Sequence, residues 1–362
     1  MSVESTPDAV PGSPDEREAA RRTQRSRVVR GVGGAALLVG GGAAAVVSRA
    51  RIAEWWGELV GVSWRWVLLA AVVQLVSMHC LIAQQQVLLR AGGGRAPVRA
   101  VAGTLYAGNA ISIGVPVAGA AASAAYTFRR LRGLGNPVAL VSWALAVSGI
   151  AATVTLAAVL AVGAGVTGSA LGAVGAFVAS AVAVVPVVVA ILVVRHQATR
   201  AVLVRLLTRG ARTLGRWVPA LRGAEVGRRI DDLLTSLGSY RLGAGGAAAT
   251  GLLGLTNWLL DAGCLALALR AVHADVPWQG LLLAWAAGTL VSATRLTPGG
   301  IGIVEAALAS ALVAAGLPAS QAVPAVVVYR LVSLWLLAGI GALCLVTAPT
   351  DPTTSHPGQP AG

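Results

Sequence analysis

Long apolar stretches alternate with short polar connections over most of the chain, from about residue 31 to residue 346. A helix needs about 20 apolar residues to cross the hydrocarbon core of a bilayer. This criterion predicts transmembrane helices near residues 31–47, 66–88, 138–162, 170–194, 243–269 and 323–346. We therefore expect an all-α polytopic membrane protein with about six full spans.

Two further apolar stretches, 101–128 and 278–317, are interrupted in the middle by proline and glycine. Because proline cannot continue a helix, each stretch is expected to form a broken hairpin. The hairpins would be re-entrant, or each arm of the second would cross the membrane by itself. If they enter from opposite faces they form an inverted repeat, which in transporters places the binding site where the half-helices meet.

The ends of the chain differ from the apolar region. Residues 1–30 mix proline, serine, acids and arginines without apolar periodicity, which is typical of a disordered tail. Residues 347–362 form a second, proline-rich tail. The predicted organisation is thus one transmembrane domain, 31–346, between two disordered tails.

Composition supports the membrane assignment, because 56% of the residues are hydrophobic and 12% are charged. A net charge of +14 in a soluble protein would suggest a nucleic-acid partner. Here the arginines lie between the apolar stretches, so they indicate orientation and no nucleic acid is expected. The positive-inside rule places both termini and the segments 90–99, 128–132 and 195–241 in the cytoplasm, and we expect the bacterial cell membrane as the location.

The basic loop 195–241 contains arginines at helical spacing, with leucines on the other side. Such a helix could lie on the anionic inner leaflet. The loop could equally serve only to fix topology, or offer a docking surface to an enzyme of the cell envelope.

Four charged residues fall within the apolar stretches: Asp261, Arg295, Glu305 and Arg330. Each costs roughly 3 kcal/mol at the bilayer centre if it is unpaired, so these residues must pair or face water. A purely structural network of two ion pairs and a functional site both fit the sequence. Asn257 lies one helical turn before Asp261, and either a helix contact or a polar groove would explain the pair. Tyr329 would supply a hydroxyl beside Arg330 or pack as an interfacial aromatic.

The motif Pro298-Gly299-Gly300 breaks the second interrupted stretch. The helix that follows begins with free N–H groups, which favour an anion. Together with Arg295 this would suit a phosphate head group, and Glu305 would balance the helix dipole or bind a cationic group. A simple structural kink is the alternative.

The sequence predicts neither a metal nor a cofactor. Cys80, Cys264 and Cys344 lie far apart within apolar stretches, and motifs for metallohydrolases, P-loops and serine hydrolases are missing. We therefore expect a protein that is not an enzyme.

Three segments resemble the C-terminal signature of the lysylphosphatidylglycerol synthase transmembrane family, the flippase-like domain family. They are NWLLDAGCLALAL, TRLTPGGIGIVEAALASALVAAGLP and AVPAVVVYRLVSLWL. The segment YAGNAISIGVPVAGAAASAAYTFRRLRGLG resembles the family's N-terminal proline block. The resemblance covers about residues 50–346.

The resemblance implies a multispanning domain that moves a lipid or lipid-linked molecule between leaflets. The motif positions that match are Pro298, Gly299, Gly300, Gly302, Glu305, Tyr329 and Arg330. We expect these residues, with Arg295, Asp261 and Asn257, to bind the substrate. One departure is Ala120, which follows Gly119 where many members have a glutamate. The synthase members carry a further aminoacyltransferase domain, which this sequence is not expected to contain. The alternative function is a non-transporting membrane partner of an envelope glycosyltransferase or lipid-modifying enzyme.

Overall fold

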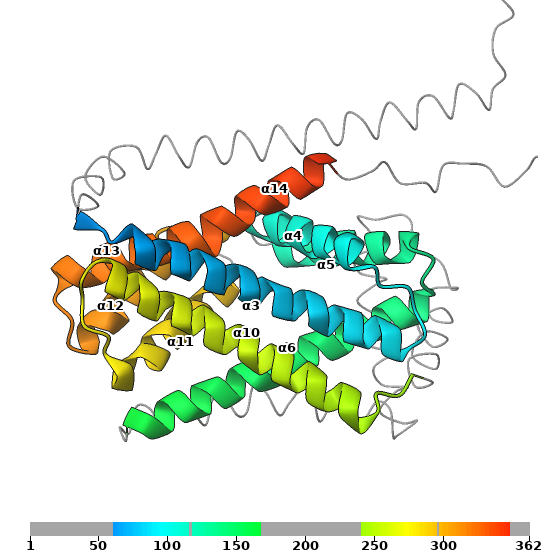
Figure 1. Ribbon diagram of the computed structural model, residues 1–362, viewed down its shortest axis with the longest axis horizontal. Coiled ribbons are helices and arrows are strands. Elements are labelled where there is room, and N and C mark those ends of the chain that lie inside the picture. Colours follow the sequence, from blue (N-terminus) through cyan, green and yellow to red (C-terminus); the bar gives the residue numbers. More distant parts are fainter. Residues whose placement is uncertain (1–60, 116–117, 168–239, 295–296, 348–362) are drawn as a thin grey trace, which may run out of the picture. The chain divides into compact units, whose positions relative to one another are not determined.

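The computed structural model describes residues 61–115, 118–167, 240–294 and 297–347, and within these ranges the chain is helical without strands (Figure 1). The predicted all-α fold is confirmed. The helices are α3 (Trp64–Ala91), α4 (Val98–Gly114), α5 (Gly119–Gly133), α6 (Val138–Thr167), α10 (Ala244–Ala271), α11 (Trp278–Thr294), η3 (Pro298–Gly300), α12 (Ile303–Ala314), α13 (Ala319–Arg330), the π-helix η4 (Leu331–Leu336) and α14 (Leu337–Thr347).

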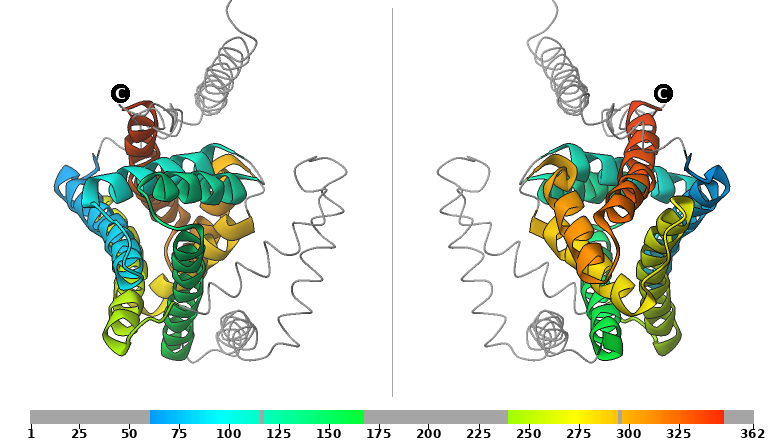
Figure 2. Two further views of the ribbon diagram at one scale, coloured as in Figure 1. Left: turned by 90° about the vertical axis from the view of Figure 1, so that its right-hand side faces the viewer. Right: turned by 90° about the vertical axis from the view of Figure 1, so that its left-hand side faces the viewer.

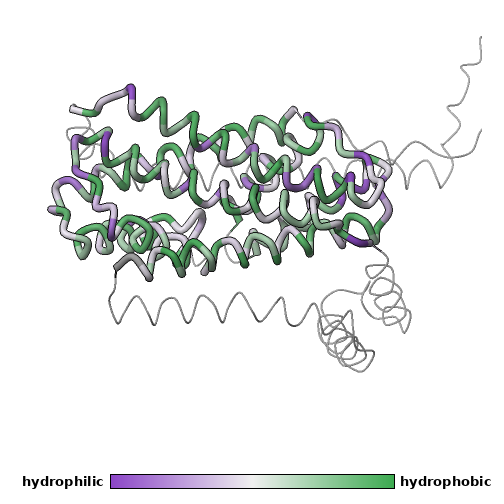
Figure 3. The backbone as a smooth tube through the Cα atoms, turned by 60° about the horizontal axis from the view of Figure 1, so that its bottom comes forward, coloured by the Kyte–Doolittle hydropathy of each residue, from purple (hydrophilic) through white to green (hydrophobic). Residues whose placement is uncertain are grey.

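In the part of the chain that the structure describes, four helical segments are long and apolar enough to cross a membrane: Trp64–Ala91, Val138–Gly165, Ala244–Ala271 and Ala319–Thr347. They confirm the predicted spans 66–88, 138–162, 243–269 and 323–346. Figure 3 shows hydrophobic residues along these helices, with many of the hydrophilic residues near the helix ends. The predicted spans 31–47 and 170–194, both tails and nearly all of the loop 195–241 lie outside the described residues.

Both interrupted stretches are broken where proline and glycine predict it. The first forms α4 and α5, and the second forms α11 and α12 with the short turn η3 between them. In the second break Gly299, Gly300 and Gly302 have φ values of 61°, 71° and 88°, which side chains other than glycine rarely adopt. Since α4 and α11 have 17 residues each, each arm is somewhat shorter than a full span.

The described helices repeat one pattern. A 28-residue helix, α3 or α10, is followed by a 17-residue helix, α4 or α11, then a short helix and another long helical segment. The turns that end the two 28-residue helices match, since Gly93 and His273 both have positive φ, 74° and 60°. The amides that follow them bond alike, Gly94 to the Leu89 carbonyl and Ala274 to the Leu269 carbonyl.

The two repeats run in opposite directions. α3 and α10 lie side by side along their length (Figures 1 and 2). They are antiparallel, because the backbone N–H of Ser63, just before α3, donates to the carbonyl of Ala271 at the end of α10 at 2.8 Å. Ser77 and Asn257, which are 180 residues apart, meet at the middle of this contact. The same separation relates Gly93 to His273, so Ser77 and Asn257 are equivalent positions that meet at the centre of the contact, and the helices indicate an inverted repeat.

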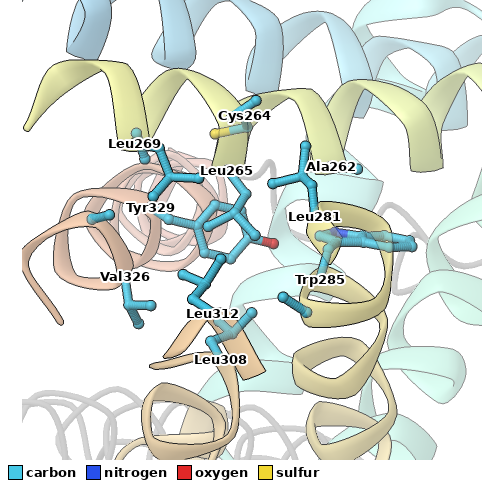
Figure 4. Packing of buried hydrophobic residues seen from close by; sticks show 14 of the residues in the cluster. Ala262, Cys264, Leu265, Leu269, Leu281, Trp285, Leu308, Leu312, Val326 and Tyr329 are labelled. Carbon is cyan, nitrogen blue, oxygen red and sulfur yellow. The ribbon is translucent and has the colours of Figure 1, made fainter. Parts of the chain in front are cut away.

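Small residues allow the two repeats to interlock. A Cβ on Gly341 of α14 would lie 2.2 Å from the Tyr106 carbonyl oxygen of α4, and one on Gly163 of α6 would lie 2.9 Å from the Leu282 Cβ of α11. Small residues are the usual means by which membrane helices pack closely. One buried cluster, shown in part in Figure 4, includes Trp285, Leu308, Leu312 and Tyr329 and brings together α10, α11, α12 and α13.

Candidate functional site

A cavity of about 340 Å³ lies where the two broken hairpins meet. Ser112, Ile113 and Val115, at the end of α4, form one side, and Gly299 and Gly300 of the second break form another. A Cβ added to Gly299 would lie 3.2 Å from the Ile113 Cγ2 atom, so the glycine permits the close approach of the two breaks. In inverted-repeat transporters the substrate binds at such a junction.

The remaining walls combine charged, aromatic and hydroxyl side chains. Asp261 comes from α10, Trp285 from α11, and Tyr329 and Arg330 from α13. Figure 4 shows the Tyr329 ring directed from α13 toward the side of Trp285. Further lining residues are Asn109, Trp258, Thr289, Ser292, Thr297 and Ser333. A cavity with this lining suits a polar group that carries charge.

Arg330 fastens the second break to α13. Its Nε donates to the Glu305 Oε1 atom at 2.7 Å, and one terminal nitrogen donates to the Gly299 carbonyl. The side chain is 10% exposed, so these charge-assisted bonds are shielded from water. Arg330 therefore neutralises one carboxylate and holds the turn that borders the cavity.

Glu305 occupies the beginning of α12. Its Oε2 accepts a 2.6 Å bond from the Gly302 N–H, three residues earlier, as an N3 glutamate does in a capping box. The sequence left two roles open for Glu305. In the structure its carboxylate lies where it balances the helix dipole of α12. The helix N-terminus, expected to receive an external anion, has the chain's own carboxylate as partner.

Asp261 has a different environment. Its Oδ2 accepts bonds from the Trp285 Nε1–H at 2.8 Å and from the Tyr329 hydroxyl at 3.1 Å. The Gln74 side chain of α3 is a further hydrogen-bond partner. All three donors are neutral, and among the described residues no ion pair joins Asp261 to an arginine. Asp261 is thus the carboxylate whose charge the described residues leave uncompensated.

The other predicted site residues have separate places. Asn257 faces α3, where its Oδ1 accepts a 3.0 Å bond from the Ser77 hydroxyl, and it does not line the cavity. The helix contact, which the sequence left as one of two explanations, is the observed one. Pro298, Gly302 and Glu305 build the second break without lining the cavity. Arg295 lies outside the described residues.

Sequence reasoning missed several residues at the site. Trp285 and Gln74 bond Asp261, and Trp258 stacks edge-on against Trp285 with ring centroids 5.7 Å apart. Trp285 stands in the middle of an apolar arm, where an indole N–H needs a partner. The sequence could therefore have indicated a polar partner for Trp285. The position of Gln74 could not be predicted in this way, because it depends on how α3 packs against α10.

Within the described part of the chain no group of three or more histidine, cysteine, aspartate or glutamate side chains could hold a metal ion.

Comparison with known proteins bears on the whole domain. A family model described as "Lysylphosphatidylglycerol synthase TM region" matches residues 32–341, which is most of the chain. A comparison with the curated proteins finds no match. The match includes the broken hairpins, the cavity and the Glu305–Arg330 pair described above. The chain belongs to the lysylphosphatidylglycerol synthase transmembrane family.

Proposed function

We propose that the protein moves a lipid or lipid-linked molecule between the leaflets of the cell membrane and that the cavity receives its head group. The observation that carries this proposal is the position of the cavity, at the junction of two broken hairpins from an inverted repeat. Membership of a lipid-related membrane family supports it. The N and C termini are proposed to face the cytoplasm.

The size of the cavity suits a head group rather than a whole lipid. Its volume, about 340 Å³, is at the lower end of the roughly 300–1,000 Å³ typical of small-molecule pockets. The acyl or prenyl chains would remain in the bilayer, whose apolar environment they match. A head group entering the cavity leaves water, so polar wall residues must replace its hydration.

The charges favour a head group with a phosphate and a polar or cationic part. The Arg330 guanidinium has five N–H donors and lines the cavity, so a phosphate could share it with Glu305. Asp261 lies on another wall and would accept hydrogen bonds from hydroxyl or amino groups. Trp258 and Trp285 add aromatic faces that attract cations.

The test is lipid movement in proteoliposomes that contain a fluorescent phosphatidylglycerol. The fraction of probe in the outer leaflet is followed by chemical quenching. Wild-type protein should move the probe, and Arg330→Ala should reduce the rate at least about tenfold, as expected when one strong polar contact worth about 1.4 kcal/mol is lost. Arg270→Ala is the matched control, because Arg270 is exposed at the end of α10.

The insertion of each variant is verified by its elution profile in detergent. Movement that persists unchanged in an inserted Arg330→Ala protein would exclude the cavity as the head-group site. If the wild type moves neither phosphatidylglycerol nor a polyprenyl-phosphate probe, the non-transporting partner of an envelope enzyme becomes the better explanation.

A further inference from the structure

We propose that Asp261 binds a small monovalent cation, Na⁺ or H⁺, which serves as the coupling ion of the transporter. The binding site stands on the structure alone, whereas the coupling rests on the proposed function. Na⁺ and H⁺ share the chemistry that the site selects, a compact positive charge next to oxygen atoms.

Hydrogen-bond acceptors are in excess around Asp261. The carboxylate is surrounded by neutral donors from Trp285, Tyr329 and Gln74. The Gln74 carbonyl oxygen, on a side chain 5% exposed, is buried and finds no hydrogen-bond partner among the described residues. A carboxylate and an unpartnered amide oxygen therefore belong to two side chains in contact, where a cation would satisfy both.

Charge balance in the described part of the site supports the same conclusion. Glu305 and Arg330 neutralise each other at 2.7 Å, and Arg330 is also bonded to the Gly299 carbonyl. Around Asp261, α13 contributes Tyr329 and Arg330, α10 contributes Cys264, and α3 and α11 contribute neutral side chains. A charged group that remains unpaired inside a membrane is costly, and such groups commonly serve ion or proton pathways.

The geometry favours a small cation over a bulky one. Asp261 lines the cavity, but Gln74 does not. Its oxygen is buried in α3 and is not part of the cavity lining, so a compact cation suits it better than a head-group amine. A compact cation therefore fits the carboxylate and the amide oxygen better than a bulky one.

A cation at this position gives transport a source of energy. When Asp261 carries it, the polar cluster between α10, α11 and α13 loses its excess negative charge, and the cost of burying that cluster in the apolar part of the membrane falls. Closure of the cavity would then depend on the ion, and the ion gradient would set the direction of lipid movement.

The experiment measures ion binding without any transport. The apparent melting temperature of the full chain in a neutral detergent is recorded while NaCl replaces choline chloride at constant ionic strength, at several pH values. The wild type should be stabilised in a saturable way by Na⁺, or by acid in the absence of Na⁺, and these two arms distinguish the cations. Asp261→Asn should lose this dependence, and Asp275→Asn, which changes an exposed aspartate after α10, should retain it.

A second variant protects the test against misfolding of Asp261→Asn. Gln74→Met removes only the unpartnered oxygen and its amide, and it should raise the half-saturating cation concentration severalfold. The proposal is overturned if Na⁺ and acid raise the melting temperature of the wild type no more than that of Asp261→Asn. This result is expected if Arg295 neutralises Asp261. Failure of the lipid assay would contradict the proposed function and leave cation binding at Asp261 intact.

Discussion

Two acidic residues of the same region, Glu305 and Asp261, have opposite kinds of partner. Glu305 bonds a guanidinium and a helix N-terminus, whereas Asp261 bonds an indole, a phenol and an amide. The first arrangement stabilises a fixed negative charge. The second leaves the charge open to a mobile partner, so we assign Glu305 to the architecture of the break and Asp261 to binding.

We predict that Glu305→Gln destabilises the protein. The substitution leaves the buried Arg330 guanidinium without a countercharge, and breaking a buried ion pair from one side costs about 3 kcal/mol. The measurement is the midpoint of unfolding in detergent.

The double variant Glu305→Gln, Arg330→Gln is the control, since it removes both charges and should recover part of the loss. If Glu305→Gln alone leaves the midpoint unchanged, the pair does not fasten the break.

The sequence predicted much of the site at this scale. Asp261, Glu305, Tyr329 and Arg330 could be recognised because charge and hydroxyl groups are rare in apolar stretches. The pairing could not be predicted, since four charges allow several pairings and only the turn of the second break brings Glu305 to Arg330. Asn257 illustrates the same limit, because its face toward α3 depends on packing.

The broken hairpins are the elements that create the cavity. Gly299, Gly300 and Gly302 have positive φ, and the turn that they form lets Glu305 cap the beginning of α12. Arg330 of α13 then bonds the Gly299 carbonyl of this turn. Immediately after Arg330 the helix widens into the π-helix Leu331–Leu336, and Ser333 and Leu334 of this segment line the cavity. π-helical turns occur frequently at functional sites.

The packing of α14 against α4 provides a test at the scale of elements. Gly341→Ala would place a Cβ 2.2 Å from the Tyr106 carbonyl oxygen, so the helices must separate. Overpacking of this kind costs about 1–3 kcal/mol, which should lower the melting temperature.

Gly339→Ala, two residues earlier on the same helix, has nothing within 4 Å of its Cβ and should leave the protein equally or more stable. Equal stability of the two variants would show that α14 does not contact α4 as described.

The position of each break could be predicted from the sequence, because Pro298-Gly299-Gly300 cannot continue a helix. The direction in which each arm packs could not. The 3.6-residue period of hydrophobic residues identifies a face when one side of a helix is polar, and here nearly every side is apolar, so the pattern does not indicate which face is buried.

At the scale of the whole molecule, the described helices combine a symmetric frame with an asymmetric site. The first two helices of each repeat have equal lengths and a matching turn between them, but the charged residues that line the cavity, Asp261 and Arg330, both come from the second repeat. The first repeat contributes neutral residues, from the last turns of α4 and from Leu156 of α6. The frame explains how a cavity can form between the repeats, and the asymmetry explains why only one of them would carry the ligand.

The clearest sequence signal of the symmetry lies at the ends of the two 28-residue helices. Comparison of the proline blocks near Pro116 and Pro298 gives little beyond proline and glycine. The ends of the 28-residue helices, LLRAGGGRAPV and LALRAVHADVPW, share the pattern of leucine, arginine, alanine and proline. The antiparallel contact of α3 with α10 still had to come from the structure, since sequence similarity between repeats does not specify their relative direction.

The most direct test of the central claim is native mass spectrometry of the protein extracted with its membrane lipids, with Arg330→Ala and the control Arg270→Ala measured alongside. A head group bound in the cavity predicts one phospholipid or polyprenyl-phosphate species that is retained by the wild type and by Arg270→Ala and is lost from Arg330→Ala. The same bulk lipids on all three proteins would contradict the claim and would reduce the charges around the cavity to a structural network.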